Sequence, residues 1–199
     1  MSKGISILIL AAGASTRMGD KVKQLLPWGT STLLENVIDT AKQVADSVFV
    51  VLGANKEEIE KVISLDVVTI YNPNWQSGMG SSISIGIQNI LKQAKEHKGL
   101  IIMLADQPLI DTSYLNEIKK EFDQGDFKIV ATSYENKLGV PAIFHQSIIP
   151  ELVNLNEDYG ARHIIQKYRT QLKQVFPKGK ELDIDTPENY NQLIDKMNT

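Results

Sequence analysis

Two kinds of stretch alternate along the chain. Short, continuously apolar runs are followed by longer stretches in which apolar residues recur at helical spacing. The apolar runs lie at 5–10, 47–52, 67–71, 99–104 and 128–132. The helical patterns lie at 31–45, 55–64, 79–96 and 111–123. Strands that are apolar throughout and separated by amphipathic helices are typical of a parallel sheet covered on both faces. The pattern therefore predicts a doubly wound α/β fold.

The last third of the chain is less regular. Residues 140–145 and 182–185 have the composition of strands, and 147–154 and 158–168 have helical spacing. A final helix is predicted over 186–197, with Thr186 as its N-cap and Pro187 at its first position. Because no repeat, low-complexity tract or linker divides the sequence, we expect residues 1–199 to form one domain.

Composition narrows the classes of partner and chemistry. The formal net charge of −3 and the pI near 5.7 give no reason to expect nucleic-acid or anionic-membrane binding. The absence of cysteine excludes disulfides, zinc–thiolate sites and thiol nucleophiles. No apolar run near the start is long enough to span a bilayer, so the sequence predicts a cytoplasmic protein.

The first candidate for chemistry is the loop after the first apolar run. It combines small residues at 11–14 with the hydroxyls of Ser15 and Thr16 and the cations Arg17 and Lys23. It has neither the spacing of a Walker A loop nor that of a dinucleotide-binding loop. Small residues let backbone amides approach a ligand, and the cations suit an anion such as a triphosphate. The alternative is a plain strand–helix connection with solvated cations.

Three further clusters follow predicted strands, and ligands of α/β sheets bind at the carboxyl ends of strands. The stretch 72–88 places Gly78, Ser81 and Ser82 before a helix, where hydroxyls and loop carbonyls suit the edge of a base. The alternative is that the serines cap the helix. Asp106 and Asp185 each follow a strand and suit Mg²⁺ shared with substrate phosphates, or else cap the next element.

A last candidate is the sequence "DYGAR" at 158–162. It places Gly160 and Arg162 before a helical stretch, where the arginine suits the phosphate of an acceptor substrate. A surface ion pair is the alternative.

In order along the chain, these stretches resemble the nucleotidyltransferases of the molybdenum cofactor pathway. The motifs are "LAAGASTRMG", "KQLLPWG", "NPNWQSGMGSSISIGI", "LADQP", "GVPAIF", "YGAR" and "DIDTPENY". The resemblance covers nearly the whole chain and implies a Rossmann-like nucleotidyltransferase fold, with a mostly parallel twisted sheet and helices on both faces. The nucleotide contacts it implies are Leu10, Ala11, Ala12, Gly13, Ser15, Arg17, Lys23, Gly78, Ser81 and Ser82.

Within that family the chain is most similar to the cytidylyltransferases, because it has "LAAG" at 10–13 and the segment "GMGSS" at 78–82. The resemblance implies Mg²⁺-dependent transfer of CMP from CTP to the phosphate of molybdopterin, with release of pyrophosphate. Arg17, Lys23 and Asp106 are then catalytic, Asp106 and Asp185 hold the metal, and Gly160 and Arg162 contact the acceptor.

Two departures from the family pattern leave alternatives open. The distance from Arg17 to Lys23 is one residue longer than usual, which leaves Lys21 as a second candidate for the phosphate contact. Lys137 is displaced by a leucine before "GVPAIF", in a region expected to face the acceptor. The other readings are a GTP-dependent guanylyltransferase for the same cofactor, a transferase for a sugar or polyol phosphate, and a non-catalytic accessory protein of a molybdenum hydroxylase.

Overall fold

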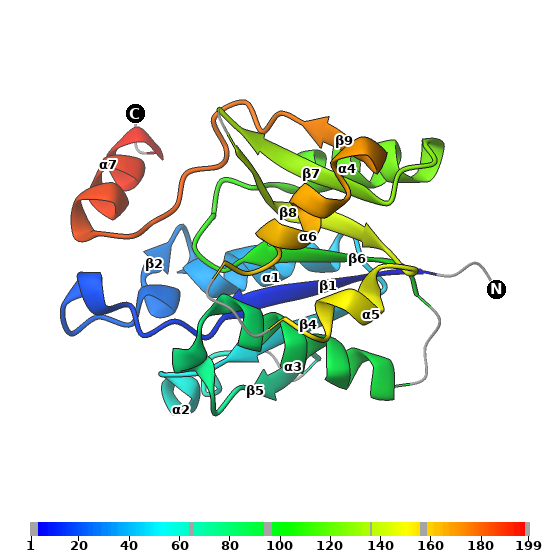
Figure 1. Cartoon of the computed structure of the whole chain (residues 1–199). Helices are drawn as coiled ribbons and strands as arrows, with labels where there is room; N and C mark the ends of the chain where they lie inside the picture. The colour runs from blue at the N-terminus through cyan, green and yellow to red at the C-terminus, as the bar shows by residue number, and fades with distance from the viewer. Residues whose placement is uncertain (1–3, 64–65, 94–96, 136, 156–158, 198–199) are drawn as a thin grey trace.

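Seven strands form one mostly parallel sheet in the order β5-β4-β1-β6-β8-β7-β9 (Figure 1). The computed structural model describes residues 4–63, 66–93, 97–135, 137–155 and 159–197. The strands are β1 (Gly4–Ala11), β4 (Ser47–Leu52), β5 (Val68–Tyr71), β6 (His97–Leu104), β7 (Ile129–Tyr134), β8 (Lys137–His145) and β9 (Leu172–Val175). Of these, β8 runs antiparallel to its neighbours β6 and β7, and the other pairs are parallel.

Both faces of the sheet are covered by helices, as Figure 1 shows. Along β1, Ile7 and Ile9 belong to the apolar cluster that includes residues of α1 (Leu33–Lys42) and α4 (Thr112–Gln124). Leu8 and Leu10 belong to the opposite cluster, with residues of α3 (Met79–Lys92), α5 (Ile149–Leu152) and α6 (Arg162–Lys167). Successive residues of one strand thus enter different cores. The predicted doubly wound fold is confirmed.

A third, smaller cluster connects the two ends of the chain. It joins Met18 of the first loop and Trp28 of the hairpin β2–β3 (Pro27–Trp28 and Ser31–Thr32) to Ile184 and to Leu193 of α7 (Pro187–Met197). In Figure 1, α7 lies beside this hairpin and away from the sheet. The cluster fixes the segment that carries Asp185 close to the loop that carries Arg17.

The predicted strand at 182–185 is wrong, because these residues pair with no strand. The segment instead crosses the carboxyl edge of the sheet, where the Ile184 N–H donates to the Asp106 carbonyl at 2.9 Å. The sequence analysis also missed β9 and the hairpin. Both are short, and Lys173 and Gln174 of β9 are exposed, so neither has a continuous apolar run.

The helices match the predicted order, and all but α4 are shorter than the periodic stretches. Only Lys56–Ile59 of the pattern at 55–64 is helical (α2), and the helix predicted from 158 begins at Arg162. Positions 64, 94–96 and 158 of the predicted helices lie outside the described residues. In the described part of the chain, no helix is both long enough and apolar enough to cross a membrane.

Helix α1 begins with a capping box that can be tested directly. The Thr32 hydroxyl accepts from the Glu35 N–H, and the Glu35 carboxylate accepts from the Thr32 N–H. Thr32→Ala removes one of these bonds and should lower the free energy of unfolding by about 1 kcal/mol, or the melting temperature by about 2–4 °C. Thr32→Ser keeps the hydroxyl and should remain close to wild type in thermal unfolding. Equal losses in the two variants would contradict this role.

Candidate active site at the carboxyl edge of the sheet

Three segments far apart in the sequence meet at the carboxyl ends of β1 and β6. The loop 11–17 leaves β1, residues 105–108 leave β6, and the segment 181–185 crosses both. Backbone hydrogen bonds fix this arrangement: the Ala105 N–H donates to the Leu10 carbonyl at 3.1 Å, and Ile184 is bound to Asp106 as described above. One edge of the sheet therefore brings together three of the segments that the sequence analysis singled out for chemistry.

A lysine between two carboxylates lies at the centre of this edge. Lys23 Nζ is 2.7 Å from Asp106 Oδ2 and 3.3 Å from Asp185 Oδ1. Arg17 Nη2 lies 3.1 Å from the other oxygen of Asp185. The Lys23 side chain is only 13% exposed, whereas Arg17 is 67% exposed. Lys21 is exposed, so Lys23 is the lysine that reaches the carboxylates, despite the longer spacing.

The loop 11–17 is held in shape by Gln24, a residue that the sequence analysis passed over. The Gln24 amide donates to the carbonyls of Ala11 and Gly13 at 3.1 and 3.2 Å, and its oxygen accepts from the Ser15 hydroxyl. Ser15 is in the left-handed region (φ 57°), and its hydroxyl also accepts from the Lys23 N–H. The resulting hollow of about 90 Å³ is lined by Leu10, Ala11, Gly13, Ser15, Lys23, Gln24, Ala105 and Asp106. Most of the predicted phosphate-binding residues thus surround one small cavity.

The loop before α3 differs in detail from the expected base site. The Asn72 amide donates to the hydroxyls of Ser81 and Ser82 at 2.9 and 3.0 Å, and Ser82 is buried. The Ser81 hydroxyl also lies 2.8 Å from the Gly78 carbonyl, to which it donates. Both hydroxyls therefore serve the internal structure of the loop. A role of Gly78, Ser81 and Ser82 in nucleotide binding stays a prediction. Because both hydroxyls are engaged, the backbone of this loop would make the contacts with the nucleotide.

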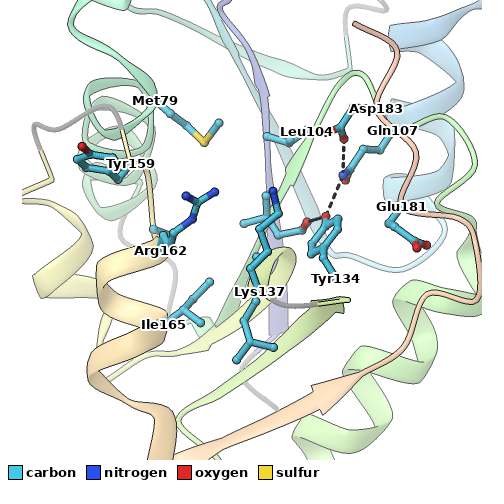
Figure 2. A pocket seen from close by; sticks show the side chains of 14 residues that line it. Met79, Leu104, Gln107, Tyr134, Lys137, Tyr159, Arg162, Ile165, Glu181 and Asp183 are labelled. Atoms are coloured by element: carbon cyan, nitrogen blue, oxygen red, sulfur yellow. Dashed lines mark hydrogen bonds between the residues drawn. The ribbon is translucent and has the colours of Figure 1, made fainter. Parts of the chain in front are cut away.

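A second, larger cavity opens beside the first. It has a volume of about 420 Å³ and is lined by residues of β6, β8, α6 and the segment 181–183, as Figure 2 shows. Arg162 and Lys137 supply its cations, and Met79 and Tyr159 supply apolar and aromatic surface. Gly160 (φ 57°) lies next to it, and a Cβ there would come within 2.7 Å of the Met79 sulfur. The two predicted acceptor residues, Gly160 and Arg162, are thus at or beside one cavity.

Asp183 belongs to this larger cavity, although no role was predicted for it. Its carboxylate accepts from the Gln107 amide at 2.8 Å, and Asp185, two residues on, faces Lys23 instead. The residue as a whole is exposed, but its carboxyl group lies in the cavity wall. Loss of water there, together with the charges of Asp106 and Asp185, raises the pKa of Asp183 to about 6.

The donors at this edge fit a hard divalent cation. Asp106 Oδ1 is buried and has no hydrogen-bond partner, and the Asp185 carboxylate lies on the other side of Lys23. Two carboxylates with substrate phosphates and water are the usual ligands of Mg²⁺. Within the described ranges, no group of three or more His, Cys, Asp or Glu side chains is arranged to hold a metal by itself. The protein thus offers part of a coordination shell.

Comparison with known proteins identifies the family of this chain. The family model described as the MobA-like NTP transferase domain matches residues 7–174. The chain belongs to this family. The resemblance inferred from the motifs is therefore confirmed at the level of the MobA-like NTP transferase domain.

The proteins to which this chain is similar have widely different names. The chain is 27% identical over 199 residues to the nicotine blue oxidoreductase of Paenarthrobacter nicotinovorans, covering 94% of this chain and 95% of that protein. It is 30% identical over 171 residues to the bifunctional protein GlmU of Francisella tularensis subsp. novicida, covering 84% of this chain but only 36% of GlmU. The chain thus spans about a third of the length of that relative.

Solved structures share this architecture over nearly the whole chain. Rv0371c from Mycobacterium tuberculosis H37Rv is similar with a TM-score of 0.82 and 25% identity, covering 98% of this chain and 100% of that one. A manganese complex of Rv0371c gives a TM-score of 0.76 and 26% identity, covering 97% and 99%. The nucleotidyltransferase fold is therefore established.

The raised pKa of Asp183 predicts a defined pH dependence of stability in metal-free buffer. The folded protein binds a proton at Asp183 more tightly than the unfolded chain, so this residue makes stability fall as the pH rises from about 4 to about 6. Asp183→Asn keeps the acceptor for Gln107 and removes the charge. The variant should match wild type near pH 4 and unfold at a higher temperature above pH 7. A melting-temperature difference that does not change with pH would contradict the assignment.

Proposed function

We propose that this chain transfers CMP from CTP to the phosphate of molybdopterin, with Mg²⁺ bound at Asp106 and Asp185, and releases pyrophosphate. The observation that carries the proposal is the position of Lys23 between these two carboxylates, at the mouth of the loop 11–17. The two large apolar clusters cover the two faces of one sheet, and the third joins the first loop to α7, which supports a single nucleotidyltransferase domain over residues 1–199. A cytoplasmic location stays a prediction.

The paired charges can exchange partners when substrate binds. Without ligand, Lys23 and Arg17 neutralise Asp106 and Asp185. A metal–triphosphate complex offers each side chain a new partner, because the carboxylates can turn to the cation and the basic groups to the phosphates. Each of these charged side chains then has a partner of opposite charge in both states, so none is left unpaired at a partly buried site.

Asp106 and Asp185 are the residues that would hold the metal. When bound, Mg²⁺ supplies Lewis acidity that offsets negative charge on the phosphates. Support comes from the unpartnered Oδ1 of Asp106 and from the similar protein Rv0371c, which has been solved with manganese.

The transfer itself requires positioning more than proton chemistry. An oxygen of the acceptor phosphate forms a bond to the α-phosphorus of CTP, and the bond from that phosphorus to the oxygen bridging to the β-phosphate breaks. The electron pair leaves with pyrophosphate. Arg17 and Lys23, with the backbone of the loop 11–15, bind this leaving group as its charge grows. A phosphate nucleophile is already ionised at neutral pH, so no general base is needed.

The assignment of each substrate to a cavity follows from chemistry. The hollow of about 90 Å³ beside Lys23 suits phosphate groups, and the cavity of about 420 Å³ suits a larger acceptor that carries an anion for Arg162 and Lys137. The preference for CTP rests on the "LAAG" and "GMGSS" segments, and molybdopterin rests on the ordered motifs and the MobA-like family.

Equilibrium binding of the four nucleoside triphosphates, with and without Mg²⁺, tests the first half of the proposal. Wild type should prefer CTP and need Mg²⁺, and Asp106→Asn should lose the metal-dependent part. Asp123→Asn is the matched control, because Asp123 also lies between two lysines, Lys98 and Lys119, but near the opposite edge of the sheet. A preference for GTP would instead indicate a GTP-dependent guanylyltransferase for the same cofactor. The absence of binding would overturn the proposal.

Arg17→Ala tests the binding of the leaving group. We expect kcat for pyrophosphate release to fall about a hundredfold, because one positioned donor to the developing charge is lost. The melting temperature should change little, since this side chain is mostly exposed. Arg169→Ala, an exposed arginine hydrogen-bonded to Gln166, serves as the control. Full activity in Arg17→Ala would exclude the role, whichever acceptor is used: molybdopterin, a sugar phosphate or a polyol phosphate.

A further inference from the structure

Three buried side-chain amides lie at the carboxyl edge of the sheet. In the described part of the chain, the buried amide residues are Gln24, Asn72 and Gln107, with 4%, 1% and 1% of their surface exposed. None of them has a place in the transfer step. Burying an amide is unfavourable unless its donors and acceptor are satisfied, so the partners of each one show what it holds.

Gln24 holds the phosphate loop. Its two donated hydrogen bonds satisfy the carbonyls of Ala11 and Gly13, two residues that line the hollow beside Lys23. Its oxygen accepts a hydrogen bond from the Ser15 hydroxyl, and that hydroxyl accepts one from the Lys23 N–H. The loop and the catalytic lysine are therefore connected through one amide.

Asn72 does the same for the loop before α3. Its amide nitrogen donates to the hydroxyls of Ser81 and Ser82 in the first turn of the helix, and its oxygen accepts from the Asn74 N–H at 3.0 Å. The Ser81 hydroxyl also contacts the carbonyls of Asn74 and Gly78. Asn72 thus sets the shape of the segment 74–82, where the base of the nucleotide is expected.

Gln107 holds the wall of the larger cavity, as Figure 2 shows. Its amide nitrogen donates to the Tyr134 hydroxyl at 2.9 Å and to Asp183 at 2.8 Å, and Tyr134 donates to the Val140 carbonyl. Both donors are used, so the amide orientation is fixed. Its buried oxygen has no hydrogen-bond partner.

We propose that these amides are positioning residues, each of which orients one binding wall: Gln24 for the phosphates, Asn72 for the base and Gln107 for the acceptor. This inference rests on the proposed function. An amide suits the task because it offers two donors and an acceptor without net charge. A carboxylate at Gln24 would repel the triphosphate and lose both donated bonds, and an apolar residue would leave the loop carbonyls without their donor.

The three variants Gln24→Met, Asn72→Leu and Gln107→Met test the division of roles, since each introduces an apolar side chain of similar length and removes the hydrogen bonds. We expect Gln24→Met to weaken binding of inorganic pyrophosphate by about tenfold to a hundredfold and to keep the CTP-to-GTP preference. Asn72→Leu should reduce that preference by about tenfold and keep pyrophosphate affinity within about twofold. Gln107→Met should leave both nucleotide measurements near wild type and raise KM for molybdopterin.

Thermal unfolding of the same variants separates positioning from stability. All three should lose stability, since each loses buried hydrogen bonds, but each should change a different ligand measurement. If all measurements fall together in every variant, or if none of them changes, the inference is wrong, and CTP binding by wild type would leave the proposed function intact. If wild type binds neither CTP nor pyrophosphate, the proposed function itself fails.

Discussion

The site depends on one ion cluster, Lys23 between Asp106 and Asp185. The partners are 83 and 162 positions from the lysine in sequence, so this contact joins the first loop, the end of β6 and the segment before α7. The lysine is nearly enclosed, and a cation in that position needs its two carboxylates, as they need it. Removing any one member would leave an unpaired charge at the point where three segments meet.

The side chains around Lys23 include more carboxylates than basic groups. Asp106, Asp183 and Asp185 lie close enough that their repulsion contributes to the raised pKa of Asp183, and Asp106 Oδ1 lacks a partner. An edge with surplus carboxylate is unfavourable for a triphosphate alone and favourable for one that arrives with a divalent cation. Repulsion among these carboxylates thus adds to the effect of burial on the pKa of Asp183 and supports the proposed need for a metal.

Side-chain amides hold the loops of the site in shape through hydrogen bonds. The loop at 11–17 has no apolar side chain larger than alanine, and the loop at 72–82 has only Trp75 and Met79, so hydrophobic packing alone does not determine the shape of these loops. Gln24, Asn72 and Gln107 supply hydrogen bonds in place of packing. They also form hydrogen bonds with groups that were predicted to contact ligands, such as the hydroxyls of Ser81 and Ser82.

The sequence alone determined the order and type of the main elements and the ends of the strands where chemistry lies, because burial on both faces imposes a pattern that each strand and helix carries by itself. It predicted Arg17, Lys23, Asp106 and Asp185 for one edge. Only the tertiary structure decided that residues 182–185 cross the sheet and that Asp183 faces the larger cavity. The roles of Gln24, Asn72 and Gln107 could not be predicted for the same reason. A buried polar residue acquires its role from its partners, and no local sequence pattern indicates which distant groups will surround it.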